Sequence, residues 1–271
     1  MCIRDRRKSD SERFPGAQIT TSIEAMMADR RALQAGTSHY FGPNFARAFD
    51  IQFLDKNNSL QYCETTSWAI SSRMIGAIIM VHGDDQGLVL PPRLAPIQTV
   101  IVPIFKSDAD QGVVMEVADR VFAELKAAGI RVKLDDRDNL SPGFKFNDWE
   151  MRGVPVRVEI GPKDVANGVV ALARRDRPGK EGKSFVPQTD LAATVGRLLD
   201  DIQSSLLQRA TEYRDAHIHE PAGYDDFKQI VADGWAFAWW CGRAECEASI
   251  KEETRATTRC IPPNQPDQSG D

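Results

Sequence analysis

The fold of the central part of the chain is decided by residues 98–134, which read QTVIVPIFKSDADQGVVMEVADRVFAELKAAGIRVKL. Residues 98–104 predict an apolar strand, and residues 130–134 predict the next strand. Between them, apolar residues recur at helical spacing, and Gly129 ends the helix that this spacing predicts. These apolar positions are Val114, Val117, Val121 and Leu125. A strand, a helix and a second strand of these lengths predict a parallel crossover unit in an α/β sheet.

The sequence on either side of this unit predicts further elements. Residues 154–160 and 169–173 predict two more strands, and residues 195–206 carry one apolar helical face. Upstream, residues 46–53 alternate partly and predict a strand, whereas residues 70–81 predict a buried helix.

Three prolines follow that buried helix and mark a linker, at Pro91, Pro92 and Pro96. We therefore predict a domain boundary here, with one domain over residues 13–95 and the next over residues 96–188. Residues 1–12 are polar without apolar periodicity, and they are interpreted as a foreign-looking or disordered leader outside the fold.

Composition limits the classes of protein that the chain can form. It has 271 residues, 42% hydrophobic and 27% charged, which suits a globular protein with one or two cores. Its longest apolar run, residues 74–81, is shorter than the roughly 18 residues that a membrane helix needs. The formal net charge of −5 argues against a surface that binds nucleic acid everywhere. Five cysteines, an odd number, favour a reducing compartment, so we predict a cytoplasmic location.

Two cysteines near the C-terminal end, Cys241 and Cys246, lie between a predicted strand and a predicted helix. Two thiolates so spaced could make half of a tetrahedral zinc site, with Cys260, His217 or His219 as candidates for the remaining ligands. The alternative is that both are ordinary buried thiols.

Residues 34–39 read QAGTSH and combine small polar groups with one imidazole. Such side chains supply hydrogen-bond donors and acceptors without bulk, which suits a pocket for a small ligand. A tight turn is the alternative interpretation.

Residues 141–185 form the one basic stretch of an acidic chain, with nine lysines and arginines against six acidic residues. Phe144, Phe146 and Trp149 are interleaved with them. Aromatic residues among basic ones suit stacking on unpaired bases. The alternative is a solvated face over a core that contains aromatic residues.

A set of motifs runs through the chain in order and nearly without gaps, from about residue 11 to the end. The motifs are FPGA (14–17), IEAMM (23–27), LQAGTSH (33–39), TSW (66–68), RMIG (73–76), VHGDD (81–85), GLVLPP (87–92), APIQ (95–98), GFKF (143–146), WEMRGVP (149–155), EIGPKD (159–164), RRD (174–176) and CG (241–242). Over this length the sequence resembles the prolyl-tRNA synthetases that carry a C-terminal extension.

The resemblance implies a fold of the α/β and α+β classes in three parts. The first is the C-terminal part of a class II catalytic core with an antiparallel sheet. A mixed-sheet α/β anticodon-binding domain follows. Residues 189–271 then form a helical connection and a small, truncated α+β domain that is similar to a zinc-binding one.

The resemblance also implies a ligase activity in two steps. Proline and ATP, with Mg²⁺, form prolyl-adenylate, and the prolyl group passes to tRNA(Pro). No covalent enzyme nucleophile is needed, because positioning and charge stabilisation supply the rate. Members of the family are usually homodimers.

Specific residues are implied for the catalytic part by matching the family motifs. The ATP contacts are Gln34, Thr37, Ser71 and Arg73, and His39 is a wall of the proline pocket. The guanidinium of Arg73 suits both phosphate and adenine. The sequence departs from the family at Ala69, which is usually glycine, and at Pro43, which is usually glutamine.

Anticodon contacts are implied in the basic stretch, at Phe146, Glu150, Arg157, Pro162 and Lys163. Anticodons for proline end in GG, and a carboxylate can accept both donors on the Watson–Crick edge of guanine. The alternative is that Glu150 and Arg157 pair with each other on a solvated surface.

The first and second class II signatures and a second cysteine pair have no counterpart in the sequence. We therefore expect a fragment of a proline–tRNA ligase, truncated at both ends, with an incomplete zinc site at Cys241 and Cys246. Such a fragment is expected to be inactive alone. The alternative is a non-catalytic tRNA-anticodon-binding module built from the same domains.

Overall fold

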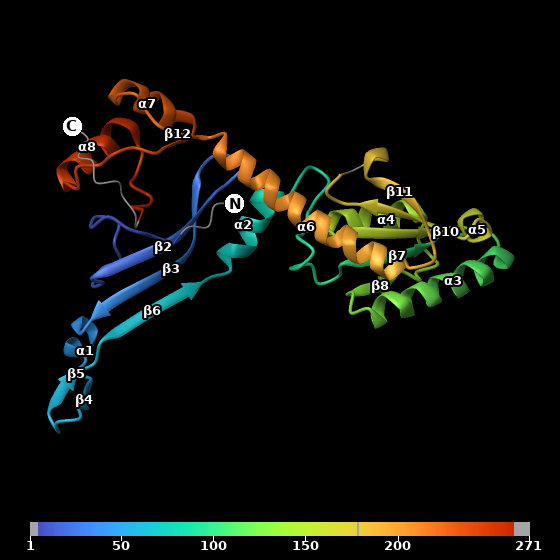
Figure 1. Cartoon of the computed structure of the whole chain (residues 1–271), viewed down its shortest axis with the longest axis horizontal. Coiled ribbons are helices and arrows are strands. Elements are labelled where there is room, and N and C mark those ends of the chain that lie inside the picture. Colours follow the sequence, from blue (N-terminus) through green and yellow to red (C-terminus); the bar gives the residue numbers. More distant parts are fainter. Residues whose placement is uncertain (1–4, 178, 263–271) are drawn as a thin grey trace. The chain divides into compact units, whose positions relative to one another are not determined.

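The computed structural model describes residues 5–177 and 179–262, which form two compact units (Figure 1). The first unit comprises Met1–Val81 and Ala210–Asp271, and the second comprises His82–Arg209. Of the segment interpreted as a leader, residues 1–4 lie outside the described part, as do residues 263–271 of the predicted C-terminal domain.

The second unit is built on a five-stranded sheet in the order β11-β10-β9-β7-β8. The strand β7 runs parallel to its neighbours β8 and β9, whereas β10 runs antiparallel to β9 and to β11. The parallel crossover predicted from residues 98–134 is therefore confirmed. The strands are β7 (Thr99–Pro103), β8 (Val132–Leu134), β9 (Val156–Ile160), β10 (Val169–Arg174) and β11 (Lys183–Pro187).

One face of this sheet carries the main core, against the helices α3 (Asp108–Ala127) and α6 (Leu191–Asp215). The predicted apolar stripe of α3 is buried at all four positions, and α6 buries its own stripe. Because side chains alternate along a strand, Ile101, Val158 and Val170 point into this core and their neighbours point to the opposite face.

The opposite face is covered over β7 by the helix α4 (Pro142–Met151). Trp149 of α4 packs there with Val100 and Val102 of β7, and Phe146 packs at the edge of the same cluster. Two short helices complete the unit, α5 (Pro162–Ala166) and the 3₁₀ helix η1 (Lys180–Gly182).

The first unit is built on an antiparallel sheet in the order β1-β2-β3-β6. The strands are β1 (Asp5–Arg7), β2 (Ile19–Met26), β3 (Ala32–Gly42) and β6 (Thr65–Ile70). The helix α2 (Arg73–His82) packs against β2 through Ala77, which contacts Ala25 and Met27. The helix predicted over residues 70–81 exists, although it begins at Arg73. The prediction that it is buried is wrong, because Ala77 is its one buried residue and Ile75, Ile79 and Met80 are exposed.

The strand predicted over residues 46–53 is wrong. The helix α1 (Asn44–Ala48) occupies its first half, and β4 (Gln52–Leu54) pairs with β5 (Leu60–Tyr62) beyond it. Between them, Asp50 adopts a left-handed backbone conformation, with a φ of 52°, which interrupts regular secondary structure. The partial alternation has no buried face behind it, since the side chains of β4 are exposed.

The C-terminal part of the first unit is small and mixed. The strands β12 (Ile218–His219) and β13 (Trp235–Ala236) pair in parallel, and the helices α7 (Tyr224–Asp233) and α8 (Ala244–Thr254) accompany them. The predicted fold class, an antiparallel core followed by a mixed α/β domain and a small α+β domain, is confirmed. Within the described ranges, no helix is both long enough and apolar enough to cross a bilayer.

Candidate anticodon and nucleotide sites

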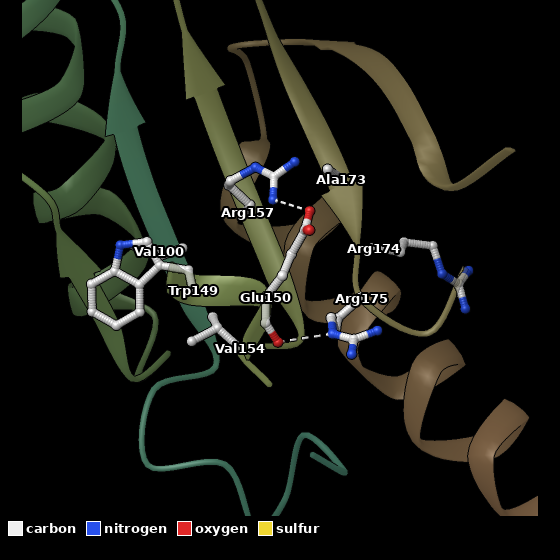
Figure 2. Close-up of a pocket in the computed structure, with 8 residues that line it drawn as sticks. All are labelled: Val100, Trp149, Glu150, Val154, Arg157, Ala173, Arg174 and Arg175. Carbon is white, nitrogen blue, oxygen red and sulfur yellow. Dashed lines mark hydrogen bonds and ion pairs between the residues drawn. The ribbon is translucent and has the colours of Figure 1, made fainter. Parts of the chain in front are cut away.

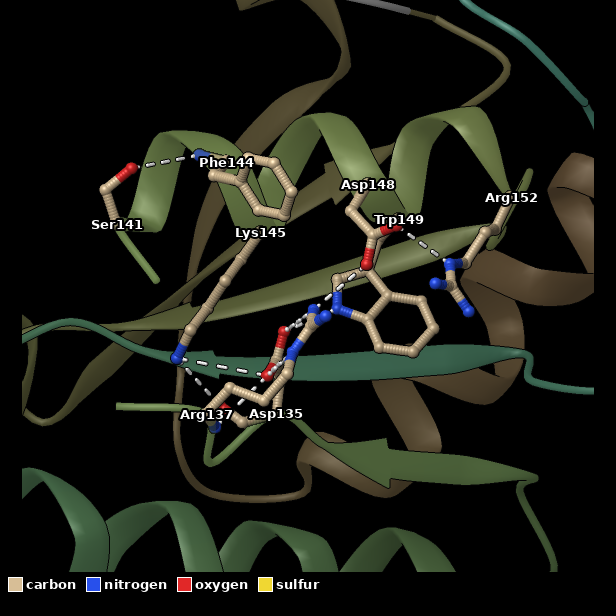
Figure 3. Close-up of polar contacts among 8 residues, drawn as sticks. All are labelled: Asp135, Arg137, Ser141, Phe144, Lys145, Asp148, Trp149 and Arg152. Atoms are coloured by element: carbon tan, nitrogen blue, oxygen red, sulfur yellow. Dashed lines mark hydrogen bonds and ion pairs between the residues drawn. The ribbon is translucent and has the colours of Figure 1, made fainter. Parts of the chain in front are cut away.

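The helix α4 is held in place by a buried carboxylate, Asp135, just after β8 (Figure 3). Ser141 caps the helix by accepting a hydrogen bond from the N–H of Phe144 at 3.3 Å. Asp135, 1% exposed, accepts hydrogen bonds from Nε1 of Trp149 at 2.7 Å and from Nε of Arg137 at 2.7 Å. The Nζ of Lys145 donates to the Asp135 carbonyl oxygen at 3.1 Å.

Electrostatics around Asp135 favour its charged form. Burial raises the pKa of Asp135, but the hydrogen bonds from Arg137 and Trp149 outweigh it and lower the pKa to about 2. Burial lowers the pKa of Lys145. The network therefore fixes the buried side of α4 through charged groups that have little contact with water.

Three of the implied anticodon residues, Phe146, Glu150 and Arg157, come together at α4, and Figure 2 shows Glu150 and Arg157. Phe146 and Glu150 are four residues apart and so share a helix face. The guanidinium of Arg157, on β9, lies over the Phe146 ring, 4.1 Å from its centroid. Its Nη1 donates to Oε1 of Glu150 at 2.7 Å. A pocket next to this cluster is lined by Val100, Trp149, Glu150, Val154, Arg157, Ala173, Arg174 and Arg175.

The Glu150–Arg157 pair, considered above as the alternative to base recognition, exists in the structure. It is not a fully solvated surface pair, because the Arg157 side chain is 13% exposed. Arg157 also donates from Nε to Oε1 of Glu159 at 3.0 Å, and Lys183 donates to Oε2 of Glu159 at 2.6 Å. Sequence reasoning missed Glu159 and Lys183 as members of this cluster.

The other two implied anticodon residues, Pro162 and Lys163, are exposed in α5, past the end of β9. Asp164 caps α5 by accepting a hydrogen bond from the N–H of Gly161 at 2.9 Å. From Arg157 to Pro162 the chain covers about 16 Å if fully extended, at about 3.3 Å per residue. Pro162 therefore lies within about 16 Å of Arg157.

Arg174 and Arg175 of the RRD motif (174–176) form hydrogen bonds next to the cluster. Arg175, 3% exposed, donates from Nη1 to Oδ2 of Asp84 at 2.7 Å and from Nε to the carbonyl oxygen of Glu150 at 3.0 Å. Arg174 donates to both carboxylate oxygens of Asp176 at 2.9 Å. Arg175 therefore holds the last turn of α4, from which the Glu150 side chain projects.

The implied nucleotide and proline residues lie in the first unit, on and beside β3. Gln34, Thr37 and His39 pair in register with Glu24, Ser22 and Thr20 of β2, in that order. Oγ1 of Thr20 and Nδ1 of His39 are 3.0 Å apart, within hydrogen-bond distance. Burial lowers the pKa of His39, which favours the neutral imidazole.

The start of α2 brings two more of these residues to the same strand. Arg73 donates from Nη1 to the carbonyl oxygen of Gln34 at 3.3 Å, and its backbone N–H donates to Oγ of Ser71 at 3.3 Å. Gln34, Ser71 and Arg73 therefore form one contiguous group, while Thr37 and His39 follow along β3.

A buried ionic network centred on Glu24 lies beside this group, and sequence reasoning missed it. Glu24, 3% exposed, accepts hydrogen bonds from Nζ of Lys8 at 2.6 Å, Oγ of Ser22 at 2.9 Å and Nη2 of Arg259 at 2.7 Å. Lys8 belongs to the segment interpreted as a leader, yet it is 4% exposed. The polar alternation of residues 20, 22 and 24 is the signal that could have indicated a buried polar face.

The predicted zinc ligands Cys241 and Cys246 flank the start of α8. Nε of Arg243 donates to Sγ of Cys241 at 3.5 Å, and this hydrogen bond lowers the pKa of Cys241 to about 7. Burial raises the pKa of Cys260 to about 11. No group of three or more His, Cys, Asp and Glu side chains in the described part of the chain could hold a metal ion. Within residues 5–177 and 179–262, Cys241 and Cys246 are therefore not part of a complete four-ligand zinc site.

Comparisons with known proteins agree with this arrangement. Residues 98–195 match the family described as an anticodon binding domain. The mixed sheet and this match define the class of the second unit, which is the anticodon-binding domain of an aminoacyl-tRNA synthetase. Residues 224–271 match the family described as the C-terminal part of prolyl-tRNA synthetase.

Relatives that match nearly the whole of this chain specify the family. The proline–tRNA ligase of Roseiflexus castenholzii is 58% identical over 263 residues, which cover 97% of this chain and 55% of that protein. The chloroplastic/mitochondrial proline–tRNA ligase of Arabidopsis thaliana is 52% identical over 260 residues, covering 94% of this chain and 48% of that protein. The chain belongs to the prolyl-tRNA synthetase family, and it spans about half the length of these relatives.

A solved structure agrees with the sequence relatives. The prolyl-tRNA synthetase of Cryptosporidium parvum, complexed with L-proline and AMP, is similar with a TM-score of 0.89 and 37% sequence identity. The match covers 97% of this chain and 57% of that chain.

Proposed function

We propose that the chain is part of a proline–tRNA ligase, which activates proline with ATP and attaches it to tRNA(Pro). Its second unit reads the anticodon. The observation that carries the proposal is the cluster of Phe146, Arg157 and Glu150, which offers an aromatic ring, a guanidinium and a carboxylate on one face of the sheet. These are the groups that recognise an unpaired guanine.

The chemistry of the cluster suits two guanines in a single-stranded loop. The carboxylate of Glu150 accepts from N1–H and N2–H of one base, and the guanidinium of Arg157 donates to O6 and N7. The 2.7 Å ion pair between these two side chains holds both in place before RNA arrives. Pro162 shapes the loop after β9, and Lys163 supplies a further charge.

The first unit is proposed to hold ATP, with Mg²⁺, and proline. Arg73 contacts phosphate or adenine, beside Gln34, Thr37 and Ser71. His39 forms a wall of the proline pocket as a neutral imidazole. ATP with Mg²⁺ supplies the activated acyl phosphate chemistry, and these residues bind and orient it. The homodimeric state and the cytoplasmic location expected from the sequence are part of the same proposal.

A non-catalytic tRNA-anticodon-binding module is the second candidate for this chain. The observation in its favour is that Phe146, Glu150, Arg157, Pro162 and Lys163 all lie in the second unit. Anticodon binding by these residues therefore needs no side chain from the first unit.

The proposal is tested by titrating the chain with tRNA that carries a GG-ending anticodon and with a variant changed to AA. The parent is expected to prefer GG, and Glu150→Gln is expected to erase most of that preference. The loss is about 1–3 kcal/mol per base, because the amide of glutamine cannot accept two N–H donors as a carboxylate does.

Two control variants accompany this titration. Glu116→Gln removes an exposed carboxylate on α3 and should leave both affinities unchanged. Lys180→Ala should weaken both tRNAs about equally, as expected for a phosphate contact. A Glu150→Gln chain that prefers GG as strongly as the parent would contradict the assignment.

Zinc is expected to bind this chain weakly and in less than molar proportion. Cys241 and Cys246 supply two thiolates, whereas a stable structural zinc site uses four ligands. The measurement is metal content after dialysis against a chelator, with Cys63→Ser as the control for an unrelated thiol. One tightly held zinc per chain, lost on Cys241→Ser, would show that other groups complete the site.

A further inference from the structure

The face of the second unit that carries the anticodon cluster extends beyond α4. In register, Arg157 of β9, Ala173 of β10 and Lys183 of β11 lie side by side across three strands. Glu159, Ala171 and Phe185 form the next row on the same face. This second row ends in a large side chain that is 64% exposed, Phe185.

Contacts establish that Phe185 and the anticodon cluster share this face. The Nζ of Lys183 is 2.6 Å from Oε2 of Glu159 and 5.7 Å from the centroid of the Phe185 ring. Val186, the next residue along β11, packs instead against the main core on the other side of the sheet. Phe185 therefore points away from that core, toward the side on which Arg157 lies.

In register, the short side chains of Ala171 and Ala173 lie between the cluster and Phe185. Two strand spacings separate β9 from β11, which amounts to about 10 Å. The ion pair between Lys183 and Glu159 spans this distance, and Ala171 between them is only 2% exposed. The Phe185 ring at the end of the row is 64% exposed and can stack on a flat group.

The charge of the adjoining segment favours RNA as the occupant. Residues 174–183, which lead into β11, carry five basic residues against two acidic ones. The segment closes tightly at Gly182, where a Cβ atom would lie 1.7 Å from the carbonyl oxygen of Arg177. This closure holds Lys183 and Phe185 in a defined position beside Glu159.

We propose that Phe185 and Lys183 form a stacking site for an unpaired base that flanks the two guanines of the anticodon. This inference rests on the proposed function and adds a base contact to it. Stacking on an aromatic ring does not depend on base identity. Phe185 therefore contributes affinity, whereas Glu150 and Arg157 contribute the choice of base.

The test is the same titration with the full chain carrying Phe185→Ala. Both the GG and the AA tRNA are expected to bind on the order of tenfold more weakly, within the range for loss of one base stack. The ratio of the two affinities is expected to stay unchanged. Phe185→Trp should restore binding, and Val113→Ala, an exposed apolar residue on α3, is the matched control.

A spectroscopic measurement identifies the contacted nucleotide. 2-Aminopurine is placed in turn at the loop positions that flank the two guanines. Its fluorescence should be quenched on binding to the parent at one of these positions and not on binding to Phe185→Ala. Unchanged affinity and unchanged quenching in Phe185→Ala would overturn the proposal.

The outcomes separate this inference from the proposed function. Loss of GG preference in Glu150→Gln, with normal binding by Phe185→Ala, rejects the stacking site alone. If the parent does not prefer the GG tRNA and Phe185→Ala weakens binding of both tRNAs equally, the proposed anticodon recognition alone is rejected. A parent that binds neither tRNA rejects both. The other occupant that the exposed Phe185 could contact is a second copy of the chain, and sedimentation of the parent and of Phe185→Ala tests it. If the parent is a dimer, the variant is a monomer and the tRNA affinity is unchanged, the RNA site is contradicted.

Discussion

Replacing Asp135 with alanine is expected to destabilise the second unit by about 3–5 kcal/mol, the usual cost of removing one partner from a buried charged pair. The substitution leaves the ammonium of Lys145 and the indole N–H of Trp149 without the carboxylate, at positions 4% and 3% exposed. It also releases Arg137 from its two hydrogen bonds to that carboxylate.

Hydrogen exchange measures this effect locally. Amides of β7 and β9, which flank the core under α4, should lose protection in Asp135→Ala while those of β2 and β3 keep theirs. Asp136→Ala is the matched control, because Asp136 is the adjacent carboxylate and is exposed. Equal protection of β7 and β9 in the two variants would contradict the assigned role of Asp135.

The low pKa of Asp135 gives the same network a pH dependence. The pKa is about 2 in the folded chain, against an ordinary value of 3.8. A lowered pKa means that the folded state holds the charged form, so the stabilisation is fully present above pH 3.8. It is lost as the pH falls through about 2. The acid sensitivity of β7 and β9 protection should therefore be smaller in Asp135→Ala than in the parent.

Replacing Glu24 with glutamine is expected to cost the first unit about 3–5 kcal/mol, for the same physical reason. Burial raises the pKa of Glu24, but the hydrogen bonds from Lys8 and Arg259 lower it below its ordinary value. The neutral amide leaves the buried ammonium of Lys8 without a counter-charge. It also weakens the contact that joins Arg259, near the C-terminal end of the described chain, to β2.

Denaturant unfolding and limited proteolysis measure the effect of Glu24→Gln. The variant should unfold at lower denaturant and be cleaved faster near residues 8 and 259 than the parent. Glu252→Gln, an exposed carboxylate on α8, should match the parent. The double variant Lys8→Met with Glu24→Gln should recover part of the loss, because it no longer buries an unpaired charge. No difference between Glu24→Gln and Glu252→Gln would show that the network does not stabilise the unit.

Several parts of the molecule followed from local sequence. The strand, helix and strand within residues 98–134 were predictable because apolar spacing alone decides which face of each element is buried. The apolar stripe of α6 followed in the same way. The failed strand over residues 46–53 has the opposite cause, since a pattern without a buried face behind it carries no information about structure.

For the candidate sites too, some features were predictable from the sequence and others were not. The family motifs identified Glu150, Arg157 and Arg73 by residue type, and the structure brings Glu150 to Arg157 and Arg73 to Gln34. The pairing of Arg175 with Asp84 was not predictable, because 91 residues separate them and strand register selects the partner.

The sequence by itself determined the elements, their buried faces and the family to which they belong, because these depend on periodicity and on ordered motifs along one chain. Only the tertiary structure decided which charges meet. Glu24 pairs with Arg259, which is 235 residues away in the sequence. Lys183 of β11 reaches Glu159 of β9 because β10 pairs with both strands, and the same register puts Phe185 in one row with Glu159. A charged side chain can pair with any opposite charge, so its partner is selected by the strand register and helix packing that bring two distant segments together.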